Sequence, residues 1–201
     1  SEAKVEYVVC NVTVEEDIQN LIKKANETFS KIDIWINNAG VNQPEKAIWE
    51  LETKDIEMVL NVDLKGAIMG SKYAMLDMMK NNSGAIYNVE GYGSNDAKML
   101  GLSIYGTSKR AVTYFTEALA KESEERNTGV IVGKLSPGIM ITDFITKALG
   151  NGETINLSEK TKKVYNILGD YPDVVAKRLA DTKMQKKKVF LYRQSSSGSL
   201  K

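Results

Sequence analysis

The sequence predicts an α/β fold in which a doubly wound parallel β-sheet packs against helices. Short apolar runs rich in β-branched residues alternate along the chain with longer stretches in which apolar residues recur every three or four positions. The runs are short enough to be strands that are buried on both faces, as in a parallel sheet. The 201 residues correspond to one domain of ordinary size.

The predicted elements alternate in chain order. Strands are expected at residues 5–9, 32–36, 85–89, 130–135 and 189–192, and helices at residues 15–29, 53–79, 105–125 and 172–184. Each of the first three helices carries one apolar stripe, so one face of each is expected to pack against the sheet. Thr13 and Glu16 are expected to form a capping box at the start of the first helix.

The composition excludes several classes of function. The 27 basic and 26 acidic residues give a formal net charge of +1, so no overall field attracts nucleic acid or an anionic membrane. No apolar run approaches the roughly 20 residues of a membrane span. The chain contains no histidine, which removes Ser-His-Asp and Cys-His catalysis and most zinc sites, so no metal is expected. The single cysteine, Cys10, fits a reducing compartment, here the cytoplasm, and is expected to be buried.

Tyr105 and Lys109 are the first candidates for chemistry. Because they are four residues apart on a predicted helix, their side chains share one face and the ammonium lies beside the phenol. This proximity favours the phenolate and lowers the pKa of a tyrosine from about 10 toward the working pH, as a general acid and base requires. Taken alone, a Tyr and Lys pair at this spacing is more often part of a solvated surface. The motifs around the pair therefore have to decide whether it is catalytic.

Three further motifs accompany this pair. They are Asn37-Asn38-Ala39-Gly40 after an apolar strand, Asn61 at the head of the segment NVDLKG, and Ser136-Pro137-Gly138 with Thr142 four residues beyond the glycine. In this order and at these spacings the chain resembles the short-chain dehydrogenases/reductases from Val5 to about Tyr192. The segments NVEGYGS and YGTSKR resemble a subgroup that includes chlorophyll b reductases and their bacterial relatives.

The resemblance implies a Rossmann-like fold and a reaction. A hydride would pass between NADP, or NAD, and the carbonyl or alcohol carbon of a small-molecule substrate. Tyr105 would donate the proton, and Lys109 would lower the pKa of Tyr105 and contact the cofactor ribose. Asn61 would distort its helix and hold a water in a proton relay to Lys109; the alternative is an exposed or capping asparagine.

The resemblance also implies contacts to the cofactor at the ends of the strands. Asn11 stands where the family usually has an aspartate, so an ordinary turn residue is the alternative there, and the Asn-Asn-Ala-Gly motif is otherwise a turn. The implied contacts are Asn11 and Val12 to the adenine end, Asn38, Ala39 and Gly40 to the ribose, Pro137 and Gly138 to the nicotinamide, and Thr142 to the carboxamide or a phosphate.

The serine that the family places before the tyrosine is absent, because Gly91 occupies its position. Ser94 is the nearest hydroxyl of the right type. The small residues at positions 91 and 93 are expected to let the loop fold Ser94 back toward Tyr105, where it would orient the substrate; the alternative is a turn serine. Glu90 beside it would modulate a pKa or anchor the loop.

The glycine-rich turn that binds the cofactor pyrophosphate in this family does not occur in the sequence. We therefore expect a domain at residues 1–193 that lacks its first strands, with a substrate lid at about 143–170 and a disordered tail at 194–201. A gap is expected beside the strand that ends at Asn37. Either the native protein is longer or the chain folds poorly. The segment that decides between NAD and NADP is missing, and lineage favours NADP.

Two other classes of function stay open. A non-catalytic dinucleotide-binding or sensor protein would explain Gly91 in place of serine and Asn11 in place of aspartate. An assembly subunit is the other alternative, because the two long helices of this family pack into homodimers or homotetramers.

Overall fold

The computed structural model describes residues 4–140, 169–183 and 193–194. A parallel sheet of three strands lies at its centre, in the order β2-β3-β4. The strands are β2 (Ile34–Asn37), β3 (Gly84–Val89) and β4 (Val130–Leu135). Their register places Trp35 opposite Ile86, and Ile86 opposite Val132. The predicted strands at 32–36, 85–89 and 130–135 are therefore confirmed, and every position of β2 is buried, as expected for a parallel strand.

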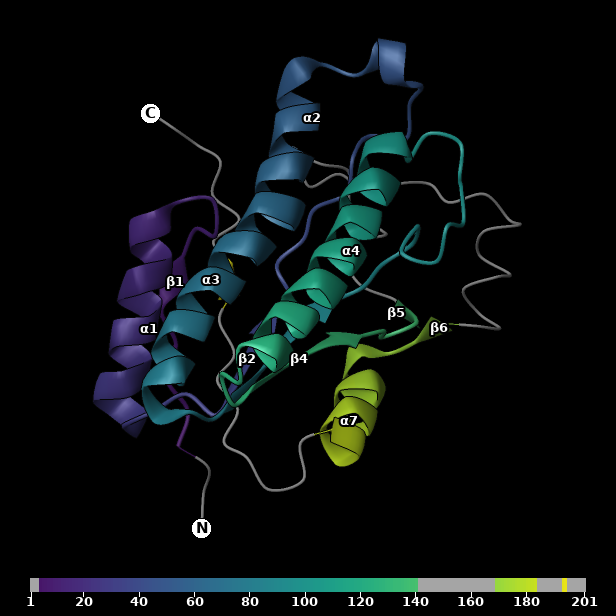
Figure 1. Ribbon diagram of the computed structural model, residues 1–201. Coiled ribbons are helices and arrows are strands. Elements are labelled where there is room, and N and C mark those ends of the chain that lie inside the picture. Colours follow the sequence, from purple (N-terminus) through teal and green to yellow (C-terminus); the bar gives the residue numbers. More distant parts are fainter. Residues whose placement is uncertain (1–3, 141–168, 184–192, 195–201) are drawn as a thin grey trace.

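Three long helical segments lie side by side along the sheet (Figure 1). They are α1 (Glu15–Phe29), the segment from α2 (Thr53–Val59) through a π-helical stretch (Leu60–Lys65) into α3 (Gly66–Met78), and α4 (Ser103–Glu125). Short 3-10 turns occur at Ile48–Glu50 and Met79–Asn81. The helices predicted at 15–29, 53–79 and 105–125 are confirmed, with an interruption of the α-helical pattern in the second.

The main core lies between the helices and the sheet. Trp35 of β2 and Ile86 of β3 pack there with apolar residues of α1 and α3, which include Ile18, Leu21, Met75 and Met78. Residues of alternate register, among them Ile34, Ala85 and Leu135, form a second cluster. Because successive side chains point to opposite faces of a strand, the two clusters belong to the two faces of the sheet.

The remaining described elements are short strand pairs and one helix. β1 (Val9–Cys10) pairs with β7 (Arg193–Gln194), and β5 (Ile139–Met140) pairs with β6 (Gly169–Asp170), both in parallel. Helix α7 (Pro172–Lys183) confirms the helix predicted from residue 172. β1 and β2 lie in separate sheets, and β2 is an edge strand of its sheet among the described residues. The gap expected beside β2 stays a prediction.

Two local predictions were wrong. The run at residues 5–9 is not a buried strand, because β1 is only two residues long and Val5 and Tyr7 are each 81% exposed. The described residues provide no strand that flanks this run over its length. The capping box of Thr13 and Glu16 is also absent: α1 begins after Val14, and Thr13 instead donates hydrogen bonds from its N and Oγ1 atoms to Asn11 Oδ1.

Cys10 is buried and unpaired, as expected, and burial and the nearby Asp17 carboxylate raise the pKa of its thiol to about 11. Within the described residues, no helix is both long enough and apolar enough to cross a bilayer. The predicted strand at 189–192 lies outside the described residues, as does the predicted lid apart from β6.

Candidate active site

The candidate site lies at the carboxyl edge of the three-stranded sheet, where open α/β sheets bind ligands. Because the strands are parallel, their carboxyl ends share one edge. Asn38, Ala39 and Gly40 follow β2, Glu90 and Gly91 follow β3, and Ser136, Pro137 and Gly138 follow β4. The predicted motifs from three distant parts of the sequence therefore meet at one edge.

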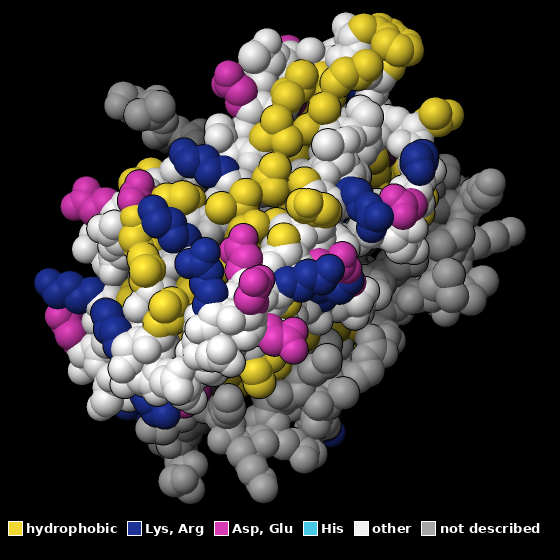
Figure 2. Space-filling view, viewed as in Figure 1, with side chains coloured by type: hydrophobic (Ala, Val, Ile, Leu, Met, Phe, Trp, Pro, Cys, Tyr) yellow, Lys and Arg dark blue, Asp and Glu magenta, His cyan; other side chains and the backbone are white. Residues whose placement is uncertain are grey.

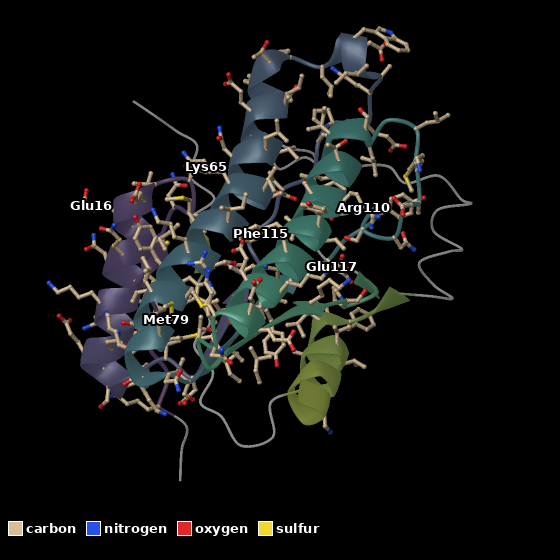
Figure 3. The ribbon with its side chains drawn as sticks, viewed as in Figure 1. Glu16, Lys65, Met79, Arg110, Phe115 and Glu117 are labelled. Atoms are coloured by element: carbon tan, nitrogen blue, oxygen red, sulfur yellow. The ribbon has the colours of Figure 1, made fainter. Side chains whose placement is uncertain are left out.

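Helix α4 carries Tyr105 and Lys109 on its buried face. The two residues are only 7% and 6% exposed, and the Lys109 Nζ atom lies 5.6 Å from the centroid of the Tyr105 ring. Arg110 and Glu117, labelled in Figure 3, are exposed on the same helix. The spacing of four residues thus has the predicted effect of bringing phenol and ammonium together on one face.

Asp63 joins this pair from the π-helical stretch, and the sequence analysis did not single it out. Its side chain is fully buried, and its Oδ2 atom lies 3.3 Å from Lys109 Nζ. Its Oδ1 atom accepts a hydrogen bond of 2.7 Å from the backbone N–H of Val41. Tyr105, Lys109 and Asp63 are called the charged cluster below. The available signal in the sequence was an acidic residue inside the NVDLKG segment, between the apolar residues Val62 and Leu64.

Burial and charge shift the pKa of Tyr105 in the direction opposite to the prediction. Burial, and then the negative charge of Asp63, raise the pKa of Tyr105 well above its ordinary value. The lowering predicted from Lys109 is therefore wrong, because burial is the larger effect. Burial also raises the pKa of Asp63, although Lys109 and the Val41 N–H favour the ionised carboxylate. Tyr105 is therefore a neutral phenol at neutral pH.

Asn61 is exposed, and its side chain makes no contact with Lys109 among the described interactions. Its backbone carbonyl accepts a hydrogen bond from the N–H of Gly66, five residues later, which is the π-helical pattern. The helix distortion expected at Asn61 is therefore present. The residue that this distorted turn brings to Lys109 is Asp63.

The loop after β3 folds back onto α4 as expected. Ser94 is buried, and its Oγ atom accepts a hydrogen bond from the Gly91 N–H at 3.2 Å and donates one to the Lys109 carbonyl at 3.4 Å. A Cβ atom at position 91 would overlap the hydroxyl of Tyr105 and lie 3.1 Å from Lys109 Cε. Glycine at this position is thus what permits the observed placement of Tyr105.

Gln43, which the sequence analysis missed, fixes the start of the helix that carries Tyr105. Its Oε1 atom accepts hydrogen bonds from the backbone N–H groups of Ile104 and Tyr105, at 2.7 and 2.8 Å. Its Nε2 atom donates to the carbonyl of Gly101 at 2.7 Å. Since the N-cap residue Leu102 has no side-chain cap, Gln43 satisfies donors that a helix start otherwise leaves open. Its distance of about 60 residues along the chain hides this role in the sequence.

Some of the predicted cofactor residues lie at the edge of the three-stranded sheet, and others lie at the end of the separate strand β1. Gly40 borders the charged cluster, since a Cβ atom there would lie 3.3 Å from Lys109 Nζ and 3.5 Å from Asp63 Oδ2. Gly138 has a φ of +79°, and no atom of the described residues lies within 4 Å of its Cβ position. Asn38 is exposed, Ala39 is half-buried, Pro137 is buried, and Asn11 and Val12 lie at the end of β1 in the separate strand pair; Thr142 lies outside the described residues.

No group of three His, Cys, Asp or Glu side chains that would hold a metal ion occurs in the described ranges 4–140, 169–183 and 193–194.

The chain is similar to known proteins in sequence and in fold. The chain is 32% identical over 180 residues to the probable chlorophyll(ide) b reductase NYC1 of Arabidopsis thaliana, which covers 89% of this chain and 34% of that protein. It is 31% identical over 173 residues to the chlorophyll(ide) b reductase NOL of the same plant, which covers 85% of this chain and 48% of that protein. The chain thus spans about a third to a half of the length of these curated relatives.

A solved structure of ElxO with NADP bound has a TM-score of 0.66 to this chain, at 23% identity, over 94% of this chain and 75% of ElxO. This likeness shows the shared Rossmann-like fold. The family model described as short chain dehydrogenase matches residues 1–151, which include β2, β3, α4 and the charged cluster. By this match over three quarters of its length, the chain belongs to the short-chain dehydrogenase family.

Proposed function

We propose that the protein is a reductase that transfers a hydride between NADP, or NAD, and the carbonyl or alcohol carbon of a small molecule. The observation that carries this proposal is the burial of Tyr105 beside Lys109 at the carboxyl edge of three parallel strands. The reductase names of the two plant relatives and the NADP bound to ElxO support the same reaction class.

Tyr105 is suited to donate a proton in this reaction. Because its pKa is raised, its phenol carries a proton at neutral pH. The nicotinamide supplies the hydride that reduces the carbonyl carbon. Tyr105 gives its phenolic proton to the carbonyl oxygen, so that C=O becomes CH–OH, and the Lys109 ammonium stabilises the phenolate left behind.

Two other side chains have less direct roles in the proposal. Ser94 orients the substrate from the loop that it holds against α4 through Gly91 and Lys109. Asn61 contributes through the π-helical turn in which it lies, which brings Asp63 to Lys109.

The proposed cofactor contacts come from the ends of the strands. The cofactor is held by Ala39 and Gly40 at the ribose, together with Lys109, and by Pro137 and Gly138 at the nicotinamide. Asn38, Asn11, Val12 and Thr142 complete the proposed cofactor contacts.

Replacing Tyr105 tests the proposal. We expect Tyr105→Phe to lower turnover of a carbonyl substrate by at least about 100-fold, because the general acid is lost. Binding of NADPH, followed by fluorescence titration, should stay close to that of the parent protein. Tyr114→Phe is the matched control, because Tyr114 lies on the same helix and is 76% exposed. Retained turnover in Tyr105→Phe would remove Tyr105 from this role.

A non-catalytic dinucleotide sensor is the second candidate function. It is favoured by Gly91 at the expected serine position and by Ser94, whose hydroxyl is engaged by backbone groups. A titration with NADPH and then NADH, followed by a screen of carbonyl substrates, separates the two functions. Cofactor binding without turnover of any substrate would favour the sensor.

Assembly into a homodimer or homotetramer remains part of the proposal. Figure 2 shows hydrophobic side chains exposed between charged ones on the face formed by α3 and α4. Leu76 of α3, Met79 in the turn after α3 and Tyr114 of α4 are 52%, 47% and 76% exposed. Size-exclusion chromatography with light scattering would test the association. The cytoplasmic location stays a prediction, since the two plant relatives are described as chloroplastic.

A further inference from the structure

Gln43 joins the loop after β2 to the start of the helix that carries Tyr105. The residue is only 4% exposed, and its amide makes three hydrogen bonds to backbone groups. Oε1 accepts from the N–H groups of Ile104 and Tyr105, and Nε2 donates to the Gly101 carbonyl. These partners fix the orientation of the amide, because the opposite orientation would turn its NH₂ group toward two N–H groups. The acceptor oxygen is therefore directed at the turn of Tyr105.

The two N–H groups belong to the first turn of α4. The helix begins at Ser103, and the N-cap residue Leu102 has no side-chain cap. The first N–H groups of a helix lack partners inside the helix, and a Ser, Thr, Asp or Asn at the N-cap commonly satisfies one of them. Here both acceptor contacts come from a residue about 60 positions upstream. The position of the Tyr105 backbone thus depends on where the loop after β2 lies.

The loop that carries Gln43 is itself fixed next to the candidate site. The backbone N–H of Val41 donates a hydrogen bond of 2.7 Å to Asp63 Oδ1, and Asp63 Oδ2 lies 3.3 Å from Lys109 Nζ. Val41 and Gln43 are two residues apart. One short segment therefore contacts the partner of Lys109 and the backbone of Tyr105, and so ties the two residues of the pair to the same loop.

The loop after β3 leaves the first turn of α4 little room to move. A Cβ atom at Gly93 would lie 2.6 Å from the Cα atom of Gly106, so the two backbones are in close contact there. A Cβ atom at Gly91 would overlap the Tyr105 hydroxyl. A small displacement of the first turn therefore changes the place of this hydroxyl relative to the loop after β3.

We propose that Gln43 is a positioning residue for the proposed reduction. By holding the N–H groups of Ile104 and Tyr105 it places the Tyr105 hydroxyl where proton transfer to the substrate carbonyl requires it. This inference rests on the proposed function and deepens it. Gln43 acts through the backbone of Tyr105. Because a misplacement of about 1 Å lowers a rate by up to about 100-fold, the loss of Gln43 is expected in kcat rather than in cofactor affinity.

Two substitutions at position 43 test this role. Gln43→Met removes the acceptor and the donor with a side chain of similar length, and we expect kcat for carbonyl reduction to fall about 10- to 100-fold. KM and NADPH affinity should stay within about threefold. Gln43→Glu keeps acceptor oxygens at the helix N-terminus, where negative charge is favourable, and loses only the donor to Gly101; its kcat should stay within about threefold of the parent. Equal kcat values for Gln43→Met and the parent would overturn the proposal.

Fluorine NMR of a fluorinated tyrosine placed at position 105 reports on the ring without any turnover. The parent and Gln43→Glu should share one resonance, and Gln43→Met should shift or broaden it. Ser123→Ala is the matched control, because Ser123 is a buried residue near the other end of α4 whose Oγ atom donates to the Val130 carbonyl at 2.6 Å. It should lower stability and leave the resonance and kcat unchanged. An equal loss of kcat in Ser123→Ala would mean that any weakening of α4 has this effect, which would also overturn the proposal.

Gln43→Asn takes the place of Gln43→Met if that variant does not fold. Its amide is one methylene shorter and does not reach all three partners, so kcat and the resonance should change in the same direction. If the resonance moves as expected but neither the parent nor Gln43→Glu reduces any carbonyl, the placement of Tyr105 by Gln43 stands and the proposed function fails. An unchanged resonance in a folded variant of an active enzyme would refute the role of Gln43 and leave the proposed function intact.

Discussion

Two buried polar regions lie between the sheet and the helices α3 and α4, and they satisfy their polar atoms in different ways. The first is a set of neutral side chains from four elements, which we call the amide network: Asn37 of β2, Ser71 of α3, Asn88 of β3 and Thr116 of α4. The second is the charged cluster of Asp63, Lys109 and Tyr105, near the carboxyl edge of the sheet.

The side chains of the amide network form hydrogen bonds with one another. Asn37 Nδ2 donates to Asn88 Oδ1 at 2.7 Å and to Ser71 Oγ at 2.9 Å, and Asn88 Nδ2 donates to Thr116 Oγ1 at 2.9 Å. Trp35 Nε1 donates to Asn37 Oδ1 at 2.7 Å. A network whose members satisfy one another fixes a unique arrangement of the elements that carry them.

The charged cluster, by contrast, contains a buried oxygen atom that accepts no hydrogen bond in the described structure. Asp63 Oδ2 has no hydrogen bond in the described structure, and the pKa values of Asp63 and Tyr105 are both raised by burial. Titratable groups held in such a state gather at functional sites. The amide network therefore consists of neutral side chains that satisfy one another, whereas the charged cluster consists of titratable side chains whose pKa values are shifted by their surroundings.

Breaking the charged cluster should have the largest effect on stability. In Lys109→Met, Asp63 is left as an unpaired buried carboxylate, and we expect the free energy of unfolding at pH 7 to fall by about 3 kcal/mol or more. The loss should be pH-dependent. Because the folded pKa of Asp63 is raised above its unfolded value of about 4, stability is retained below pH 4 and lost as the pH rises through the folded pKa.

Urea unfolding of Lys109→Met and the parent protein at pH 4 and pH 7 measures this difference. The double variant Lys109→Met with Asp63→Asn serves as the control, since it removes both charges and should recover most of the loss at pH 7. A loss that is the same at both pH values would show that Asp63 is not ionised beside Lys109.

Breaking the amide network should cost somewhat less and should not depend on pH. Asn88 is fully buried, and Asn88→Leu removes the partner of Asn37 Nδ2 and Thr116 Oγ1. Leaving such groups unsatisfied costs about 2 to 4 kcal/mol in total. Since no member of the network titrates, the same loss is expected at pH 5 and pH 8 in urea unfolding. Asn20→Leu on the exposed face of α1 is the control and should change stability by less than about 0.5 kcal/mol.

The contrast between the two regions also explains what the sequence could and could not predict. The central strands and long helices follow from local patterns, and the Tyr105–Lys109 pair follows from a spacing of four on one helix. Those features depend on neighbours along the chain, and the structure confirms them. The residues 5–9 have the same local pattern but no flanking strands over their length, so the pattern alone predicted a burial that does not occur.

Features that depend on contacts between distant segments could not be found this way. Gln43 reaches the start of α4 from about 60 residues upstream, and Asp63 meets Lys109 from a different helix. The direction of the Tyr105 pKa shift was predicted from Lys109 alone. It reversed because burial, and then Asp63, raise this pKa, and the spacing reveals neither of them.

Alanine substitutions at two glycines beside the charged cluster are expected to have the smallest effects, and they test specifically how Tyr105 is positioned. Gly106 follows Tyr105 on α4, and the nearest atom to a Cβ at this position is 4.0 Å away, so Gly106→Ala should stabilise the protein by about 0.5 to 1 kcal/mol. Turnover should be unchanged. Gly91→Ala, by contrast, places a methyl group against the Tyr105 hydroxyl, so we expect a fall in kcat with little change in cofactor affinity. Equal kcat values for both alanine variants would mean that the space left by Gly91 is not what positions Tyr105 for proton transfer.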